Sequence, residues 1–293
     1  MKDTFMKDSY ALCGAWSLCV LLAGCGAETS SNAQPDAAAE QTGAIEQTDT
    51  PAETDTPLEM DAAVIDDGVV ALLKQMTSKV AGLQEFAVTL ETGFDVLQPN
   101  GQKLEFGSRR TATIRRPDHA RFTYQQRSGV AGELVFDGSA IWAYERDQNV
   151  YATIEQPGDI DASLDLVTIE LGIPVPASDF FAKDPSIALA ADVLEAQDLG
   201  TSTIDNQPAR HIALRKPGVD YQIWISDATL LPVRVVITYH DEPGQPQFWA
   251  RFLNWETAPT NGDAVFAFSP PEGAESIRFA TFDTSESAEE AVP

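Results

Sequence analysis

The chain has 293 residues, a formal charge of −26 and 43% hydrophobic residues. This length allows one sizeable domain with a real core. The acidity argues against a nucleic-acid partner, because phosphate binding requires a basic surface. All three cysteines, Cys13, Cys19 and Cys25, lie within the first 25 residues, so the rest of the chain can form no disulfide, cysteine zinc site or thiol nucleophile.

The amino terminus has the features of a secretory signal. An apolar run over 11–23 follows Lys2 and Lys7 and is too short for a comfortable membrane span. The run ends in Leu-Leu-Ala-Gly-Cys at 21–25, which resembles the lipobox of bacterial lipoproteins, where the cysteine thiol receives the lipid. We therefore predict a signal peptide over 1–24 and a lipid-anchored, palmitate-bearing Cys25. The alternatives are a plain signal peptide and a short buried helix.

The predicted anchor places the folded part outside the cytoplasm, on a membrane surface. Gly26 follows the cysteine at the position where an aspartate marks lipoproteins that stay in the inner membrane of Gram-negative bacteria. By resemblance to those lipoproteins, we expect the periplasmic side of the outer membrane.

The residues after Cys25 are too polar to fold. Residues 26–60 contain eight acidic residues, no lysine or arginine, and few large apolar side chains. They cannot offset the entropy of ordering, so we predict a disordered tether over 25–60, with a root-mean-square reach of about 30 Å. The last residues, 283–293, have the same character. One domain is therefore expected over 61–282.

The predicted domain begins with a helix. Asp66 or Asp67 can cap its start, and Gly82 lies near its end. Its apolar residues recur at spacings of three and four along one face: Val69, Leu73, Met76, Val80 and Leu83.

Strands follow this helix. Residues 86–96 alternate between apolar and polar side chains, which is the period of a strand with one buried face. Asp137-Gly138 predicts a tight hairpin between two further strands. The strands expected in this half are 86–96, 104–114, 120–124, 134–136, 141–144 and 150–154.

The pattern then becomes helical before strands return. Apolar residues between Ile160 and Leu171 have helical spacing, with Asp159 or Asp161 as the cap, and 175–196 is expected to be short-helical. The later strands are predicted at 209–215, 221–225, 232–239, 247–255 and 264–268. About ten strands with short connections predict an α+β domain built on an antiparallel sheet, which should curl because it is large.

Several segments resemble the LolA/LolB-like superfamily of periplasmic lipoprotein carriers and receptors. They are Arg-Pro-Asp-His-Ala-Arg-Phe at 116–122, Phe-Asp-Gly-Ser-Ala-Ile-Trp-Ala-Tyr at 136–144, Tyr-Gln-Ile-Trp-Ile at 221–225 and Leu-Pro-Val-Arg at 231–234. Within the superfamily, the chain is most similar over about 65–280 to domain of unknown function 2092, a family of predicted periplasmic proteins. Segments 100–104, 237–244 and 266–273 are also typical of that family.

This resemblance implies an open half-barrel, LolA-like, whose concave face is covered by two or three helices. An apolar cavity for acyl chains would lie between sheet and helices, and each methylene transferred there from water gains about 0.8 kcal/mol. The candidate lining residues are Phe86, Val88, Leu90, Phe122, Tyr124, Trp142, Ile223, Val235 and Phe252, with Leu164, Phe180 and Phe181 in a lid. The alternative for each is a place in an ordinary packed core.

Arg116 matches the arginine of the Arg-Pro motif that soluble carriers use when lid and cavity open. Its position after Arg115, in a predicted turn, favours instead a plain surface charge. The apolar loop that protrudes from the known receptor has no clear counterpart in the sequence.

Catalytic and metal-binding motifs are not evident. The three histidines, His119, His211 and His240, are far apart in sequence and lack metal-ligand spacing. Nucleophile elbows, phosphate loops and dinucleotide fingerprints are missing as well. We therefore expect no catalytic residue, no metal and no cofactor, and a hydrolase is the least favoured reading.

The function expected from these residues is non-enzymatic binding or transfer of lipid or lipoprotein acyl chains by a membrane-tethered protein. The alternative is an envelope interaction protein, or a lipid-sensing regulator, that docks a periplasmic partner protein.

Overall fold

The computed structural model of the chain describes residues 65–259 and 261–279. The predicted signal peptide, Cys25, the tether up to residue 60 and the tail over 283–293 all lie outside the described residues. The described part belongs to one compact unit.

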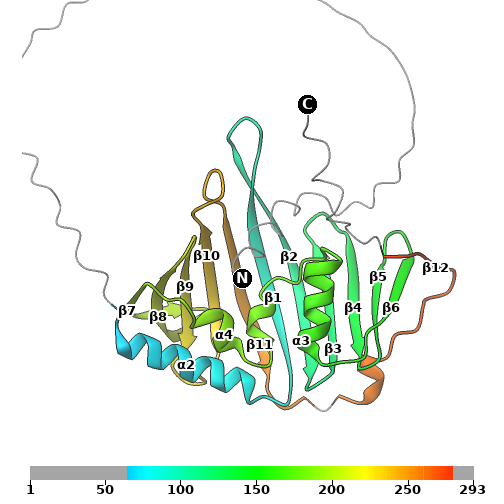
Figure 1. Cartoon of the computed structure of the whole chain (residues 1–293), viewed down its shortest axis with the longest axis horizontal. Coiled ribbons are helices and arrows are strands. Elements are labelled where there is room, and N and C mark those ends of the chain that lie inside the picture. Colours follow the sequence, from blue (N-terminus) through cyan, green and yellow to red (C-terminus); the bar gives the residue numbers. More distant parts are fainter. Residues whose placement is uncertain (1–64, 260, 280–293) are drawn as a thin grey trace, which may run out of the picture. The chain divides into compact units, whose positions relative to one another are not determined.

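Twelve strands form one sheet in the order β12-β6-β5-β4-β3-β2-β1-β11-β10-β9-β8-β7 (Figure 1). Their bounds are β1 (Glu85–Leu97), β2 (Lys103–Arg115), β3 (His119–Gln126), β4 (Ala131–Asp137), β5 (Ala140–Glu145), β6 (Val150–Glu155), β7 (Glu195–Ile204), β8 (Gln207–Lys216), β9 (Val219–Ser226), β10 (Pro232–Tyr239), β11 (Gln247–Glu256) and β12 (Glu275–Ser276). All neighbours are antiparallel except β12 and β6. Because β12 and β7 are the two edges, the sheet does not close into a barrel.

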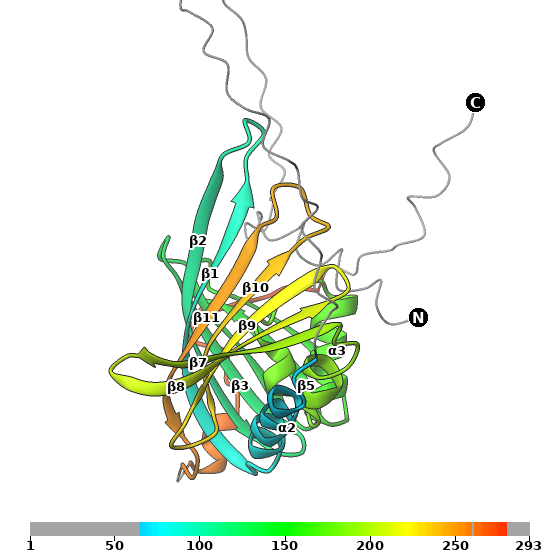
Figure 2. The ribbon, with the colours of Figure 1, turned by 90° about the vertical axis from the view of Figure 1, so that its left-hand side faces the viewer.

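The described residues contain several helical segments, and all but the last pack on one side of this curved sheet (Figure 2). They are α2 (Asp67–Ala81), α3 (Ile160–Asp165) with a π-helical turn at Leu166–Glu170, a 3-10 turn at Ser178–Phe180, α4 (Pro185–Leu189) and a 3-10 turn at Asp263–Phe266. The last of these does not belong to the group on the concave side. The predicted α+β class, with a strongly curved antiparallel sheet and a few helices, is confirmed. None of the helices in the described ranges is long and apolar enough to cross a membrane.

The inner face of the sheet is the face that carries Phe86, Val88 and Leu90 of β1; the outer face is the opposite one. These three side chains are buried, whereas their neighbours on β1 are half-buried, as the alternation predicts. One hydrophobic cluster joins the inner face to α2, α3 and α4. Burial of this face holds the helices on the sheet.

Helix α2 begins and ends where the sequence predicts. The carboxylate of Asp66 accepts hydrogen bonds from the backbone N–H of Gly68 at 2.7 Å and of Val69 at 3.4 Å. Gly82 is the C-cap. The buried residues of α2 include four of the five residues of the predicted stripe, Val69, Leu73, Met76 and Val80, whereas Leu83 follows the helix and is half-buried.

We expect Asp66→Ala to lower the free energy of unfolding by about 1 kcal/mol, because the first turn of α2 loses its acceptor. Denaturant titration of the full chain measures this change. Asp66→Asn is the control, since asparagine caps about as well as aspartate. An equal loss in both variants would contradict the capping role.

Two predictions in the second half of the domain are wrong. The segment 264–268 is not a strand; it forms the 3-10 turn Asp263–Phe266, in which Phe266 is buried on the sheet. One buried side chain produces no alternation along the chain, so these five residues do not distinguish a strand from a 3-10 turn. The ten-residue strand β7 is absent from the prediction, because only Ala196 among its residues is buried and the strand has no apolar face.

Strand β7 is an edge strand with an irregular register. Its pairing with β8 is regular from Glu195 to Asp198 and shifts before Thr201. Gly200, with a φ of +83°, lies within this bulge. At the start of β7, Ala196 accepts a backbone hydrogen bond from Asp66 at 3.0 Å, so the turn before α2 covers one end of the edge.

Candidate functional site

The predicted lining residues of the inner face lie together in one packed cluster. Seven of the nine sheet residues, and all three predicted lid residues, are buried members of it. These ten are Phe86, Val88, Leu90, Phe122, Ile223, Val235, Phe252, Leu164, Phe180 and Phe181. Five different strands and two helical segments therefore bring the predicted site residues together.

The two remaining candidates lie elsewhere. Tyr124 is buried on the inner face but beside polar groups rather than in the apolar cluster. Trp142 lies on the outer face, because its neighbour Ile141 points into the inner cluster and adjacent residues of a strand point to opposite sides. There the Trp142 ring packs against Phe268 at 5.5 Å and Tyr151 at 6.3 Å. Its place in the cavity lining is thus contradicted by the parity of β5.

The segment from Ser178 to Leu189 crosses this apolar face and is called the lid segment below. The ring of Phe181 lies 6.3 Å from Phe86 and 6.1 Å from Phe122, centroid to centroid. The ring of Phe180 lies 5.0 Å from Phe252. The lid segment therefore contributes aromatic side chains to the same cluster as the sheet.

Arg116, the residue that follows β2, holds the lid segment in place. Its guanidinium donates to the backbone carbonyls of Phe181 at 3.1 Å, Ala182 at 3.0 Å and Leu83 at 3.2 Å. Burial lowers the pKa of Arg116, and the negative charge of Asp161 opposes that shift. The side chain is only partly exposed and bonded inward, so Arg116 is not the plain surface charge that the sequence favoured.

A second cation holds the other end of the lid segment. Lys216, at the end of β8, donates to the carbonyl of Ala188 at 2.6 Å, and its ammonium lies 5.8 Å from the centroid of the Tyr221 ring. Asp179 of the lid is the nearby acid: burial raises its pKa, and Lys216 opposes that shift. The sequence offers only a turn at 216–218 as a local signal, because Lys216 and Ala188 are 28 residues apart.

The outer face carries a row of stacked rings and cations. Trp224 stacks on His211 with 4.0 Å between ring centroids. The guanidinium of Arg234 lies between two indoles, 5.5 Å from Trp224 and 5.7 Å from Trp249. Burial lowers the pKa of Arg234. These contacts tie β8, β9, β10 and β11 together through their side chains.

Gly93 on β1 leaves the space that Trp249 occupies. A Cβ at this position would lie 2.5 Å from two atoms of the indole. The Trp249 N–H also donates to Glu105 at 3.1 Å, so the ring is held in place.

We expect Gly93→Ala to cost about 1–3 kcal/mol of unfolding free energy, because the indole must shift from a packed position. Guanidinium denaturation followed by tryptophan emission would measure both the stability and the ring environment. Gly262→Ala is the matched control, since nothing lies within 4 Å of its added Cβ. Equal stability of both variants would contradict the close packing.

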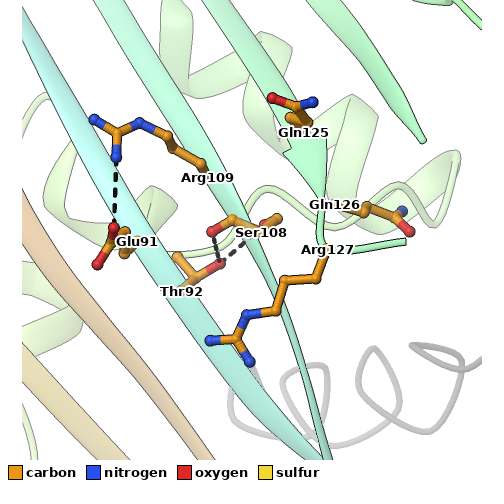
Figure 3. Close-up of a pocket in the computed structure, with 7 residues that line it drawn as sticks. All are labelled: Glu91, Thr92, Ser108, Arg109, Gln125, Gln126 and Arg127. Atoms are coloured by element: carbon orange, nitrogen blue, oxygen red, sulfur yellow. Dashed lines mark hydrogen bonds and ion pairs between the residues drawn. The ribbon is translucent and has the colours of Figure 1, made fainter. Parts of the chain in front are cut away.

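A hollow of about 340 Å3 lies where β1, β2 and the end of β3 meet (Figure 3). Its seven lining residues are all polar: Glu91, Thr92, Ser108, Arg109, Gln125, Gln126 and Arg127. Arg109 pairs with Glu91 at 3.4 Å across it. An acyl chain would gain little from such a lining, so this hollow is not the predicted apolar cavity.

The fold defines a structural class: a curved, open antiparallel sheet whose concave side is covered by helical segments. Within that class, the chain belongs to the family described as predicted periplasmic protein (DUF2092), whose model matches residues 69–280. No curated protein matches the chain.

Solved structures with a similar fold include lipoproteins and LolA-superfamily proteins. The Mycobacterium tuberculosis lipoprotein LppX is 18% identical, with 67% of this chain and 98% of that chain covered and a TM-score of 0.41. The LolA superfamily protein NE2245 from Nitrosomonas europaea is 11% identical, with coverage of 66% and 96% and a TM-score of 0.33. MucB in the Pseudomonas aeruginosa MucA/MucB complex is 14% identical, with coverage of 69% and 61% and a TM-score of 0.38.

Proposed function

We propose that this protein is a membrane-tethered periplasmic lipoprotein that binds or hands over acyl chains between the inner face of its sheet and the lid segment. The observation that carries the proposal is the lid itself. It places Phe180 and Phe181 on the apolar inner face, and two cations, Arg116 and Lys216, hold its backbone carbonyls. Hydrogen bonds from side chains to a short segment can be exchanged without unfolding the sheet.

The described residues represent the closed form in this proposal, because the candidate lining residues are packed against one another. An acyl chain enters when the lid side chains leave the inner face and methylenes take their place. Each buried methylene contributes about 0.8 kcal/mol. An acyl chain of ordinary length therefore offsets the burial energy that is lost when the two phenylalanine side chains leave the inner face. No catalytic step is required, and we propose that the protein is not an enzyme.

Lipid extraction tests this function directly. The full chain is purified from a bacterial envelope, denatured, extracted and analysed by mass spectrometry, alongside a Cys25→Ser form that carries no lipid of its own. We expect a non-covalent acyl lipid in both forms and uptake of a fluorescent fatty-acid probe by the emptied protein. Absence of lipid together with absence of probe uptake would rule out the acyl-binding function, and turnover in an esterase screen would rule out the non-enzymatic one.

The membrane anchor is a separate part of the proposal. We propose that Cys25 bears the lipid and that Gly26 directs the protein to the outer membrane. Metabolic labelling with palmitate should mark the wild-type chain and leave Cys25→Ser unmarked, and membrane fractionation should find the label in the outer membrane. Labelling of Cys25→Ser would exclude this cysteine as the attachment site.

A second function, docking of a periplasmic partner protein, is favoured by the hairpin of β1 and β2. This hairpin extends beyond its neighbours (Figures 1 and 2) and exposes Leu97, Leu104 and Phe106, the last with 48% of its surface accessible. A photo-crosslinker at position 106 in intact cells should then trap one protein in stoichiometric amount. A crosslink that survives when Phe181→Trp fills the site would separate docking from acyl binding.

A further inference from the structure

The apolar inner face ends in a row of paired residues, three of which, Arg110, Tyr124 and Glu145, have polar side chains. Directly paired residues on β1, β2, β3, β4 and β5 form one line across the sheet: Leu90, Arg110, Tyr124, Gly132 and Glu145. The next line on one side is apolar and contains Val88, Ala112, Phe122 and Leu134. The two lines are about 7 Å apart, because residues two apart in a strand share a face.

Arg110 is the cation of this polar row, and its side chain is positioned on both sides. Its Nε donates to Ser108 Oγ at 2.9 Å, and Ser108 Oγ lies 3.0 Å from Thr92 Oγ1. Its guanidinium carbon lies 5.7 Å from the centroid of the Tyr124 ring. Thr92 and Ser108 are themselves buried, so the fork of the guanidinium is fixed by a polar network at the margin of the apolar cluster.

The other end of the row carries a negative charge, that of Glu145, instead of a positive one. Tyr124 lies over Gly132, where an added Cβ would be 2.6 Å from the phenol oxygen, and Glu145 pairs with Gly132 on the far side. Burial, assisted by the negative charge of Glu145, raises the pKa of Tyr124 to about 12. The phenol therefore stays protonated and can donate. Glu145 is three strands from Arg110, or about 14 Å, so an anion is favoured only at the Arg110 end.

We propose that the Arg110 end of this row binds the anionic head group of the acyl ligand, a carboxylate or a phosphate, while the chain lies on the apolar line beside it. The inference rests on the proposed acyl-binding function and adds the class of ligand. A planar guanidinium presents paired donors that suit both anions. A purely structural arginine would support stability but would not distinguish ligands that differ only in charge.

Matched probes test the head-group site. The Cys25→Ser form of the full chain is emptied of lipid and titrated with a fluorescent fatty acid and with its methyl ester, which has the same chain and no charge. We expect the acid to bind at least about tenfold more tightly, as one charge-assisted hydrogen-bonded pair is worth about 1.5–3 kcal/mol. Competition by lysophosphatidic acid and by monoacylglycerol of equal length distinguishes phosphate from carboxylate recognition.

Arg110→Met should remove the preference by weakening the acid to the affinity of the ester. Arg110→Lys keeps the positive charge without the planar guanidinium and should retain part of the preference for the acid. This variant gives a second test if the methionine variant folds poorly. Arg109→Met is the control, since this neighbouring arginine points to the outer face and should leave the preference intact.

The outcomes separate this inference from the function on which it rests. Equal binding of acid and ester by the unmodified Arg110 protein would overturn the head-group site and leave acyl binding standing. A preference that persists in Arg110→Met would overturn the assignment to Arg110. Failure to bind either probe would overturn acyl binding and the head-group site together.

Discussion

We expect Arg116→Leu to free the lid segment and to lower the free energy of unfolding by about 3 kcal/mol or more. Three carbonyls at part-buried positions, those of Leu83, Phe181 and Ala182, lose a charged donor at once. A buried acceptor left without a partner costs about 1–3 kcal/mol, so the cost exceeds that of a lost surface ion pair. Denaturant titration gives the stability, and hydrogen exchange over 178–189 gives the local opening.

The change should be concentrated in the lid if Arg116 acts as a clamp. Arg116→Lys retains one donor group, so its free energy of unfolding should lie between those of the wild type and Arg116→Leu. Arg109→Gln should cost less than about 1 kcal/mol, because its side chain is 56% exposed and makes one long ion pair with Glu91. Uniform loss of protection across the sheet, with no excess over 178–189, would contradict the clamp and leave Arg116 as a general stabiliser.

Phe181→Ala should destabilise the closed domain by about 3–5 kcal/mol. The ring is fully buried between Phe86 and Phe122, and its removal leaves a cavity at the centre of the apolar cluster. Thermal and denaturant unfolding would measure the loss. Because acyl binding fills the same space in the proposed mechanism, a fatty-acid probe should restore more stability to this variant than to the wild type.

Ile187→Ala is the control for that experiment. Ile187 lies in the same lid segment but is 71% exposed, so its truncation should change stability by no more than about 0.5 kcal/mol. If the probe stabilises Phe181→Ala no more than the wild type, the acyl chain does not occupy the space of Phe181.

Alternation along the chain was enough to predict most of the sheet, because a strand with one buried face carries period two in its sequence. β1 and β3 have that pattern, and their bounds differ from the prediction by one or two residues. β7 lies at an edge with both faces largely exposed, so its sequence lacks the alternation of apolar and polar residues that identifies a strand. Trp142 was assigned by the size of its side chain, whereas its parity on β5 decides which face it occupies.

The apolar half of the candidate site was predictable, and the polar half was not. Bulky inward residues identify themselves by pattern, and ten of the twelve lining and lid candidates do meet in one cluster. Lys216 and Arg110 contact partners that only the folded chain brings close: an α4 carbonyl for one, and Tyr124 across a strand pair for the other. Contacts between residues so far apart in sequence leave no local pattern, so the sequence alone does not predict them.

An unclosed sheet has two rows of backbone donors and acceptors at its margins, which in other proteins invite a strand from a second molecule. The bulge around Gly200 interrupts this row on β7, since the register shift between Asp198 and Thr201 breaks the regular spacing that an incoming strand would need. Asp66 already occupies the carbonyl of Ala196. The longer of the two free edges is thereby protected against pairing with the same edge of a second copy.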